Sequence, residues 1–296
     1  MRSIAFSHDL FAPSLKGRHC KDAPYRWGGM EIIMEFSGYT FERFDTLEST
    51  NEYAKKIAAE GAKEKTVVLA SYQTKGKGRA GRSFYSPNGS NIYMSVILRP
   101  AVNFTDAQLI TVLAASCTAL AIETVTNKSV GIKWVNDIYL DNKKVAGILA
   151  EVAGGVDKEG IVDSIILGIG INVFEADEVP KDISDIYGAV YSGSEMIEDS
   201  EIRNRISDNI VKKFIELFDA CYGGIKCNTR TYETTRMIEE YKNHSIVIGR
   251  EVTYMSANEE KKVRVVGIDD DGSLIVFDES GERKKYRDGE IRIKLF

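Results

Sequence analysis

A loop of glycines and cations between two buried apolar segments restricts the folds open to this chain. It runs Lys75-Gly76-Lys77-Gly78-Arg79-Ala80-Gly81-Arg82 and contains the spacing G-x-G-x-x-G. In a dinucleotide-binding fold such a loop leads directly into a helix, whose N-terminus meets the pyrophosphate. Here the chain continues through residues 83–89 into the apolar segment 92–98, which predicts a strand that ends before Pro100. A strand–loop–strand order excludes the dinucleotide-binding fold.

The composition of this loop indicates an anion-binding site. It carries four cations and no acidic residue, although the whole chain has a formal net charge of -5. Glycines let the backbone approach a ligand and present its amides, and an Arg fork pairs with two oxygens of a carboxylate or phosphate. The alternative is a solvated basic turn, which is the commoner outcome for charged runs. Four cations interleaved with three glycines favour the anion site.

Helix and strand patterns alternate up to about residue 245. Ser49-Thr50-Asn51-Glu52 is a capping box and predicts the start of a helix that ends at Gly61. Residues 105–108 form a second capping box, which predicts a helix to about Val125. Strands are predicted over 66–70, 92–98 and 161–167, and residues 168–172 are expected to lead out of the last of these. A hairpin is predicted from strands at 132–140 and 145–152, with its turn at Asp141-Asn142. Two further helices are predicted over 201–222 and 229–241.

These patterns predict two domains and an extension. Residues 1–34 mix Pro, Gly and basic residues without a periodic apolar face, and we expect them to be disordered or extraneous. Residues 35–244 form a mixed α/β body. Residues 245–296 alternate short strands with turns at 270–272 and 280–281, which is typical of a small β barrel.

Several classes of protein are excluded by residue usage. None of the three histidines lies in a metal-binding or catalytic-triad pattern, and no pair of the four cysteines has zinc-site spacing. No uncharged apolar run appears long enough to cross a bilayer. We therefore expect a cytoplasmic protein with reduced thiols and no membrane association.

A second group of polar residues flanks the predicted hairpin. Lys133-Trp134-Val135-Asn136-Asp137 is followed across the turn by Lys143-Lys144-Val145-Ala146-Gly147-Ile148-Leu149. Taken alone, Trp134 is explained by core packing and the two lysines by a solvated turn. Side chains alternate between the faces of a strand, however, so that Lys144 and Asp137 can meet one ligand from neighbouring strands.

The ordered motifs together resemble the catalytic domain of biotin protein ligases. They are Ser49-Thr50-Asn51, Gln73 with the glycine loop, Ser86-Pro87-x-Gly89, Lys-Trp-x-Asn-Asp, Lys-x-Ala-Gly-Ile-Leu-x-Glu, and Gly168-x-Gly170-Ile171-Asn172. The resemblance is strong over residues 39–173. It implies an α+β fold, with a mixed-sheet catalytic domain related to class II aminoacyl-tRNA synthetases and a small SH3-like C-terminal domain.

The resemblance also implies roles for individual residues. Biotin contacts are expected from Ser49, Thr50, Asn51, Gln73, Gly76, Lys77, Gly78, Arg79, Lys144 and Gly147. ATP contacts are expected from Arg79, Arg82, Phe84, Asn136, Lys144 and Asn172, and catalytic roles from Arg79, Lys144 and Asp137. Two positions depart from the family pattern, because Lys77 stands where Arg is usual and Val135 where Pro is usual.

The implied reaction needs two anions to be held together. The biotin carboxylate is ionised at neutral pH, since such acids have a pKa of roughly 4–5, so no base is required for its attack on the α-phosphate of ATP. Arg79 and Lys144 are expected to bridge carboxylate and phosphate, with Mg²⁺ on the phosphates and held through Asn136 or water. Closure of the glycine loop would protect biotinyl-AMP from water. Asp137 would accept the proton of the attacking lysine of a biotin carboxyl carrier protein.

Three alternatives remain at this point. A lipoate ligase would run the same two steps, although the basic glycine loop and Lys-Trp-x-Asn-Asp favour biotin. A biotin-dependent repressor would need a winged helix before Ser49, and no helix–turn–helix pattern occurs there, so we expect a monofunctional enzyme that does not bind DNA. A binding module without catalysis would have lost Arg79 or Lys144. The resemblance also allows a homodimer.

Overall fold

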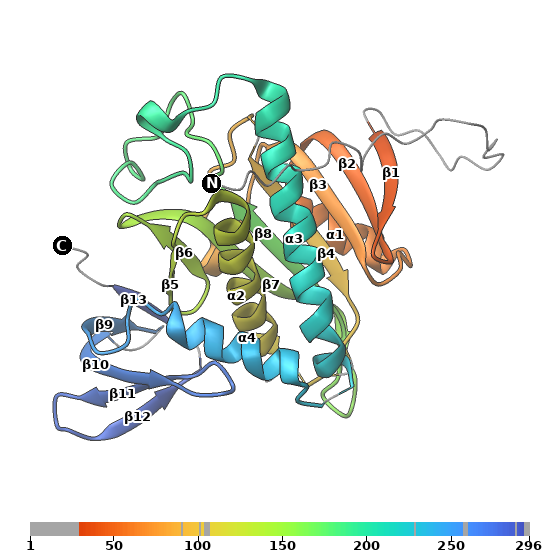
Figure 1. Ribbon diagram of the computed structural model, residues 1–296. Helices are drawn as coiled ribbons and strands as arrows, with labels where there is room; N and C mark the ends of the chain where they lie inside the picture. The colour runs from red at the N-terminus through yellow and green to blue at the C-terminus, as the bar shows by residue number, and fades with distance from the viewer. Residues whose placement is uncertain are drawn as a thin grey trace, which may run out of the picture.

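Two sheets and the helices that cover them make up the fold (Figure 1). The computed structural model describes residues 30–89, 91–100, 102–103, 107–227, 229–256, 260–287 and 289–292. The large sheet has eight strands in the order β1-β2-β3-β4-β8-β7-β6-β5, and the small sheet has five in the order β12-β11-β10-β9-β13. In the large sheet β2 and β3 are parallel while the other neighbours are antiparallel. The predicted α+β fold with a mixed sheet is therefore confirmed.

The strands of the large sheet are β1 (Met30–Phe36), β2 (Tyr39–Leu47), β3 (Thr66–Gln73), β4 (Ile92–Leu98), β5 (Gly131–Lys133), β6 (Asp137–Leu140), β7 (Lys143–Val156) and β8 (Val162–Ile171). The α-helices are α1 (Thr50–Ala59), α2 (Ala107–Thr126), α3 (Ser200–Lys226) and α4 (Tyr232–Asn243). The small sheet contains β9 (Glu251–Met255), β10 (Glu260–Ile268), β11 (Leu274–Asp278), β12 (Arg283–Tyr286) and β13 (Glu290–Arg292).

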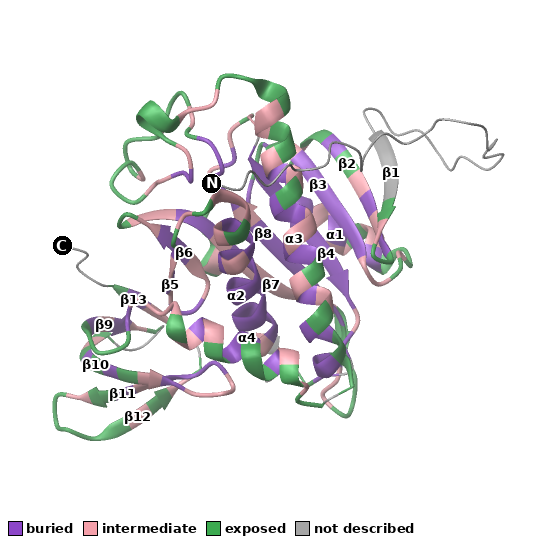
Figure 2. Cartoon of the chain, viewed as in Figure 1, coloured by how far each residue is buried: buried purple, intermediate pink, exposed green. Residues whose placement is uncertain are grey.

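The large sheet separates two apolar cores. On one face α1 buries Ala54 and Ala58 against β-strand side chains that include Val68 and Ile166. On the other face α2, α3 and α4 pack over the sheet and form the main core (Figure 1). Figure 2 shows that α2 and the central strands are the most deeply buried elements. Three layers result: α1, the sheet, and the group of α2, α3 and α4.

Helix α2 is apolar on all sides because it lies inside the protein. The segment Gln108–Thr126 has a mean hydropathy of 1.7, and by length and composition alone it could cross a membrane, although it contains the charged residue Glu123. In the fold, however, 67% of this segment is buried. A helix that is hydrophobic all round is the signature of a core helix as well as of a membrane span. The burial of α2 identifies it as a core helix.

Two strand predictions were wrong. The segment 132–140 is not one strand, because β5 and β6 pair with each other in antiparallel fashion and Lys133 lies opposite Asp137, with a turn at 134–136 between them. The glycine-containing segment 168–171 does not lead out of the sheet but continues β8. The predicted turn at Asp141-Asn142 is confirmed, since both residues have positive φ (49° and 64°), as a type I′ hairpin turn requires.

The start of α1 was predicted at the correct residue, but the predicted capping hydrogen bonds do not form. Ser49 is the N-cap of α1, but its side chain makes no capping hydrogen bond. The predicted partner Glu52 instead forms ion pairs with Lys55 and Lys77. The second capping box, over 105–108, lies partly outside the described residues.

The segment that connects the large sheet to the small one pairs with β5, the strand at one edge of the large sheet. The backbone N–H of Ile132 in β5 donates to His244 O at 2.7 Å, and the N–H of Ile246 donates to Ile132 O at 3.0 Å. The small sheet is antiparallel, with β12 and β13 at its two ends, and turns occur at 270–272 and 280–281 as predicted. At the other end of the chain, β1 begins at Met30, inside the segment 1–34 that was predicted to be an extension, while residues 1–29 lie outside the described residues.

Candidate active site

Three glycines on neighbouring strands leave a hollow in the face of the large sheet that carries α1. Gly147 of β7 lies opposite Gly170 of β8, and Gly168 lies two residues earlier on the same face. A Cβ atom at Gly168 would lie 2.2 Å from Asn51 Oδ1, and one at Gly170 would lie 2.4 Å from the ring of Phe84. Side chains from α1 and from the glycine loop therefore use the space that these glycines leave free.

Most of the predicted site residues lie around this hollow. Its open volume of about 50 Å³ is well below the roughly 300–1,000 Å³ of a typical ligand pocket. The ring of Phe84, packed against Gly147 and Gly170, fills part of the space, so that a ligand on the glycine floor must displace it. The predicted residues that line the hollow are Ser49, Thr50, Asn51, Gln73, Lys77, Gly78, Arg79, Phe84, Asn136, Lys144 and Gly147.

The start of α1 is held against the sheet by buried polar contacts. Ser95 Oγ of β4 lies 2.8 Å from Thr50 Oγ1 and 2.5 Å from Asn51 Oδ1. The other end of the Asn51 amide donates to Glu151 Oε2 at 2.8 Å. The backbone N–H of Thr50 donates to Gln73 Oε1 at 2.8 Å. These contacts set the orientation of the Thr50 and Asn51 side chains before any ligand arrives.

Gln73 links this network to the end of the glycine loop. Its Oε1 accepts from Thr50, while its Nε2 donates to Ser86 Oγ at 2.9 Å. The side chain of Ser49 is almost fully buried (3% exposed) and is not used as a helix cap. Because Ser49 lines the hollow, we expect its hydroxyl to meet a ligand that reaches the N-terminus of α1.

Two cations of the loop tie it to the surrounding structure. Lys77 Nζ lies 2.8 Å from Glu52 Oε1 of α1, and hydrogen bonds from Lys77 and Lys55 hold the pKa of Glu52 below its usual value. Arg79 Nη1 donates to Asn136 Oδ1 at 3.2 Å. The loop is thus attached on one side to a helix and on the other to the turn between β5 and β6.

Asn136 is itself fixed by β7. Its side-chain Nδ2 donates to Ile148 O at 2.9 Å, and the backbone N–H of Ile148 donates to Asn136 O at 2.9 Å. Both ends of the Asn136 amide are therefore engaged, one by the sheet and one by Arg79. This arrangement lets the sheet set the position of the Arg79 guanidinium.

Lys144 and Asp137 meet across the β6–β7 hairpin, as strand alternation predicted. Lys144 Nζ lies 2.6 Å from Asp137 Oδ1, and both side chains are mostly buried (26% and 21% exposed). The same ammonium lies over Gly147 and 5.8 Å from the centre of the Phe84 ring. A cation and a carboxylate are thus held side by side at the floor of the hollow.

Four of the predicted residues do not line the hollow: Gly76, Arg82, Asn172 and Asp137. Gly76 shapes the loop, because a Cβ there would lie 2.4 Å from the backbone oxygen of Phe84. Arg82 forms an ion pair with Glu290 of β13, in the small sheet. Asn172 donates through Nδ2 to Gly188 O at 2.9 Å and so ties the segment after β8 to the sheet. Asp137 reaches the hollow through its contact with Lys144.

Several residues at the site were not predicted. Glu151, Gly168 and Gly170 belong to motifs that carried the family resemblance, and their position in those motifs was a usable signal. Ser95 has no such signal, because it is an isolated polar residue in an apolar strand. The additional residues that line the hollow are Tyr93, Met94, Ile148, Leu149, Gly168, Ile169 and Gly170.

No protein-built metal site accompanies the hollow. Among the described residues no group of three or more His, Cys, Asp or Glu side chains could hold a metal ion. The oxygen of Asn136 already accepts from Arg79, and Asp137 pairs with Lys144. The residues present do not fit a resident metal cage.

Comparisons with known proteins agree on one family. The sequence profile of the Biotin/lipoate A/B protein ligase family matches residues 43–172, and that of the Biotin protein ligase C terminal domain matches residues 247–293. The Bifunctional ligase/repressor BirA of Bacillus spizizenii is 31% identical over 244 residues, which are 82% of this chain and 70% of that protein. A Biotin--[acetyl-CoA-carboxylase] ligase from Paracoccus denitrificans is 28% identical over 240 residues, 80% of this chain and 93% of the relative.

A solved structure has a similar fold. The biotin protein ligase from Aquifex aeolicus in complex with biotin and ATP superposes with a TM-score of 0.68 at 25% sequence identity, over 85% of this chain and 97% of that one.

Proposed function

This chain belongs to the biotin protein ligase family, and we propose that its glycine-floored hollow joins biotin to ATP and then passes the biotin to a lysine of a carrier protein. The observation that carries the proposal is the approach of Arg79 and Lys144 to one hollow from two different segments. The enzyme is thus a biotin–[biotin carboxyl-carrier protein] ligase. The match to the biotin-specific C-terminal profile favours biotin over lipoate.

In the first step a carboxylate oxygen of biotin attacks the α-phosphorus of ATP. The bond between the α-phosphorus and the oxygen bridging to the β-phosphate breaks, and pyrophosphate leaves with the electron pair. Both reactants are anions, so the chain has to hold them in line and offset their repulsion. Arg79 and Lys144 supply the two positive charges, and the Ser49–Asn51 segment with Gln73 orients the uncharged part of biotin.

In the second step the neutral amine of the carrier lysine attacks the acyl carbon of biotinyl-5′-AMP. The amide bond forms, AMP leaves with its electron pair, and the amine gives up a proton. The Asp137 carboxylate lies 2.6 Å from Lys144, which lines the floor of the hollow. We assign the acceptance of that proton to Asp137, because a carboxylate also attracts the lysine while it is still charged.

Magnesium enters this scheme with the nucleotide. Mg²⁺ prefers oxygen ligands and usually keeps several waters, so it binds largely through the phosphates of ATP. When bound it neutralises part of the phosphate charge. The side chains of the hollow hold the two organic reactants, and no step depends on a protein ligand to the metal.

In this scheme the glycine loop also protects the adenylate from water. A mixed anhydride hydrolyses in water, so the site has to exclude solvent between the two steps. The loop is attached through Lys77 to Glu52 and through Arg79 to Asn136. We assign to these two contacts the closure of the loop over the adenylate.

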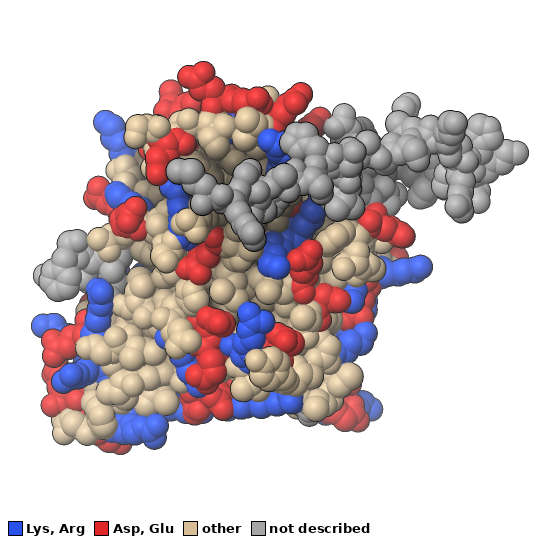
Figure 3. Space-filling model, in the orientation of Figure 1, with Lys and Arg blue, Asp and Glu red and all other residues tan. Residues whose placement is uncertain are grey.

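The surface charge supports a protein acceptor rather than DNA. Figure 3 shows both signs of charge interspersed over one face, with acidic side chains gathered at the top of the view. The net charge of the chain is -5. Non-specific DNA binding depends on neutralising phosphates with Lys and Arg. We therefore propose a cytoplasmic enzyme without a role at an operator.

The proposal is tested by incubating the full chain with biotin, ATP, Mg²⁺ and a biotin carboxyl carrier domain. We expect biotin-dependent release of pyrophosphate and a carrier whose intact mass rises by one biotinyl group. Lipoic acid in place of biotin serves as the competing substrate. Absence of both products with biotin, or a faster reaction with lipoic acid, would contradict the assignment.

Gly168→Ala tests the glycine floor. The added Cβ would lie 2.2 Å from Asn51 Oδ1 and must push the Asn51 side chain away from Ser95 and Glu151. Loss of one or two hydrogen bonds of roughly 1 kcal/mol each predicts a rise in the Kd for biotin of roughly 5- to 30-fold. Isothermal titration with biotin measures it. Gly155→Ala in β7 is the matched control, because a Cβ there meets nothing within 4 Å; equal affinity in the two variants would rule out the floor as a biotin contact surface.

A further inference from the structure

The turn that carries Asn136 is held by a part of the chain far from the hollow. Trp134 Nε1 donates to the backbone oxygen of Gly272 at 2.9 Å, although the two residues are 138 positions apart. The next residue, Val135, accepts from Tyr241 Oη at 2.9 Å. Each residue of the 134–136 turn is thus fixed by a different element, and Trp134 is the one fixed by the small sheet.

Gly272 lies at the tip of the turn between β10 and β11, close against α2. Its φ is +82°, and a Cβ would lie 2.5 Å from Val112 Cγ2, so only glycine lets the turn approach this closely. Its carbonyl accepts a second hydrogen bond, from Gln108 Nε2 at 3.0 Å. The oxygen therefore keeps a partner even when Trp134 does not donate to it.

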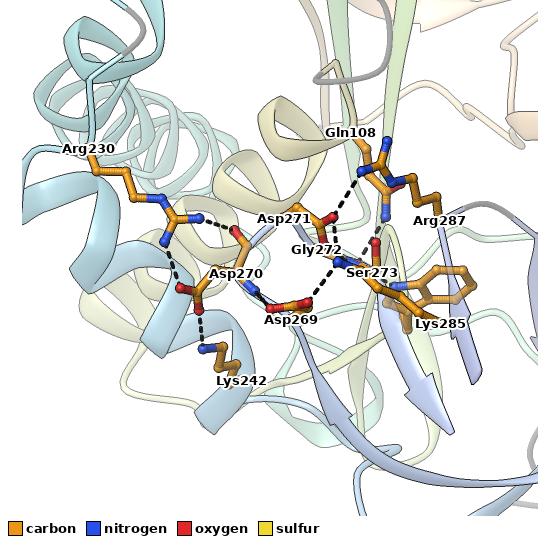
Figure 4. A network of polar contacts seen from close by, with 11 residues as sticks. Gln108, Arg230, Lys242, Asp269, Asp270, Asp271, Gly272, Ser273, Lys285 and Arg287 are labelled. Carbon is orange, nitrogen blue, oxygen red and sulfur yellow. Dashed lines mark hydrogen bonds and ion pairs between the residues drawn. The ribbon is translucent and has the colours of Figure 1, made fainter. Parts of the chain in front are cut away.

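The turn is fixed from both sides by ion pairs (Figure 4). From the large domain, Arg230 and Lys242 approach Asp270 at 2.6 and 2.8 Å. Hydrogen bonds from these two cations hold the pKa of Asp270 below its usual value. From β12, Lys285 lies 2.7 Å from Asp269 and 2.9 Å from Asp271. A single exposed ion pair contributes little to stability, but a connected set of ion pairs such as this one restricts the geometry of the turn.

A continuous series of contacts leads from this turn to the loop over the hollow. The Gly272 carbonyl holds the Trp134 indole, which is only 3% exposed. Two residues further along the same turn, Asn136 accepts from Arg79 Nη1. A shift of Trp134 therefore moves the acceptor on which the Arg79 side chain depends.

We propose that Trp134 and the 269–273 turn are a positioning device for the ligase reaction, through which the small sheet sets the place of Asn136 and Arg79 and so the retention of the adenylate. The proposal rests on the function assigned above. Neither Trp134 nor Gly272 lines the hollow, so both act through other residues rather than on the substrate.

The test is Trp134→Phe, which keeps an aromatic ring and removes the Nε1–H donor. The net effect of one neutral hydrogen bond corresponds to roughly a three- to tenfold change. We expect biotinyl-AMP to dissociate three to ten times faster from this variant, with rates counted per active site so that unfolded protein does not contribute. The biotin-dependent activity of the unaltered chain in the same assay establishes the function independently. If that activity is present and Trp134→Phe retains the adenylate as the unaltered chain does, the positioning role is wrong.

Two comparisons separate positioning from a loss of stability. Gln108→Ala removes the other hydrogen bond to the same carbonyl and leaves the Trp134 donor in place. We expect it to lower thermal stability as Trp134→Phe does, but to leave adenylate retention unchanged. In an Arg79→Gly background, Trp134→Phe should have no further effect, because the group it positions is gone. Equal kinetic effects of Gln108→Ala and Trp134→Phe, or additive effects with Arg79→Gly, would each overturn the proposal.

Discussion

Biotinyl-AMP formation is expected to slow by about 10²- to 10³-fold when Lys144 is replaced with alanine, which is the usual loss for one group that stabilises developing charge. The Lys144 ammonium lies over Gly147 and 2.6 Å from Asp137. Its removal takes a cation away from two anionic reactants. It also leaves the Asp137 carboxylate without its ion pair, so that this charge repels both reactants. Biotin-dependent exchange of pyrophosphate into ATP measures the effect directly.

A surface lysine provides the matched control for this variant. Lys213 of α3 is ion-paired with Glu216 at 3.3 Å and lies outside the hollow, so Lys213→Ala removes a paired ammonium without touching the site. We expect that variant to exchange pyrophosphate at the rate of the unaltered enzyme. Near-normal exchange by Lys144→Ala, with the fold intact by thermal melting, would assign Lys144 to a solvated turn without a catalytic role.

Arg79→Gly is expected to release biotinyl-AMP roughly 10- to 100-fold faster, because hydrogen bonds to charged groups have about twice the net effect of neutral ones. The variant loses the hydrogen bond from Arg79 to Asn136, which attaches the loop to the sheet. Lys77 and Lys144 remain, so some adenylate still forms. The escaping anhydride should acylate exposed lysines of an unrelated protein. The dissociation rate of biotinyl-AMP and the labelling of a bystander protein are the two readouts.

Ala80→Gly separates the lost side chain from the added chain freedom. Ala80 has φ 53° and ψ 36°, in the left-handed region that glycine adopts without strain. This variant therefore loosens the same loop while Arg79 stays in place. We expect it to retain the adenylate almost as the unaltered enzyme does. If Ala80→Gly releases as much adenylate as Arg79→Gly, loop flexibility and not the guanidinium controls retention.

Sequence patterns were most informative where the partners are close along the chain. Strand alternation across a two-residue turn was enough to predict that Lys144 and Asp137 meet. The segment with Gly168 and Gly170 was predicted to lead out of the strand that ends at 167, whereas it continues β8, although glycine ordinarily weakens a strand. In the fold the two glycines are needed within β8, where Asn51 and Phe84 occupy the space above them. That need arises from side chains about 85–120 positions away and has no local signature.

Polar contacts between residues far apart in the sequence could not be predicted from local sequence patterns. Trp134 was explained by core packing, and it is indeed buried, but its donor reaches a carbonyl 138 positions further on. Ser95 contacts Asn51 over 44 positions, from the middle of an apolar strand. Arg82 was assigned to ATP from its place in the loop, whereas the structure pairs it with Glu290. Such contacts depend on which strands become neighbours, and strand order is set by the whole chain.

The pairing of β5 with the segment that follows α4 limits where this chain can be truncated. Residue 245 is the predicted border between the two domains, yet Ile132 exchanges backbone hydrogen bonds with His244 and Ile246 on either side of it. A fragment that stops at 244 loses the donor from Ile246 and exposes the edge of β5, and free strand edges promote aggregation. We therefore expect that removal of the small sheet destabilises the large one, and that the two parts of the chain unfold together as one cooperative unit.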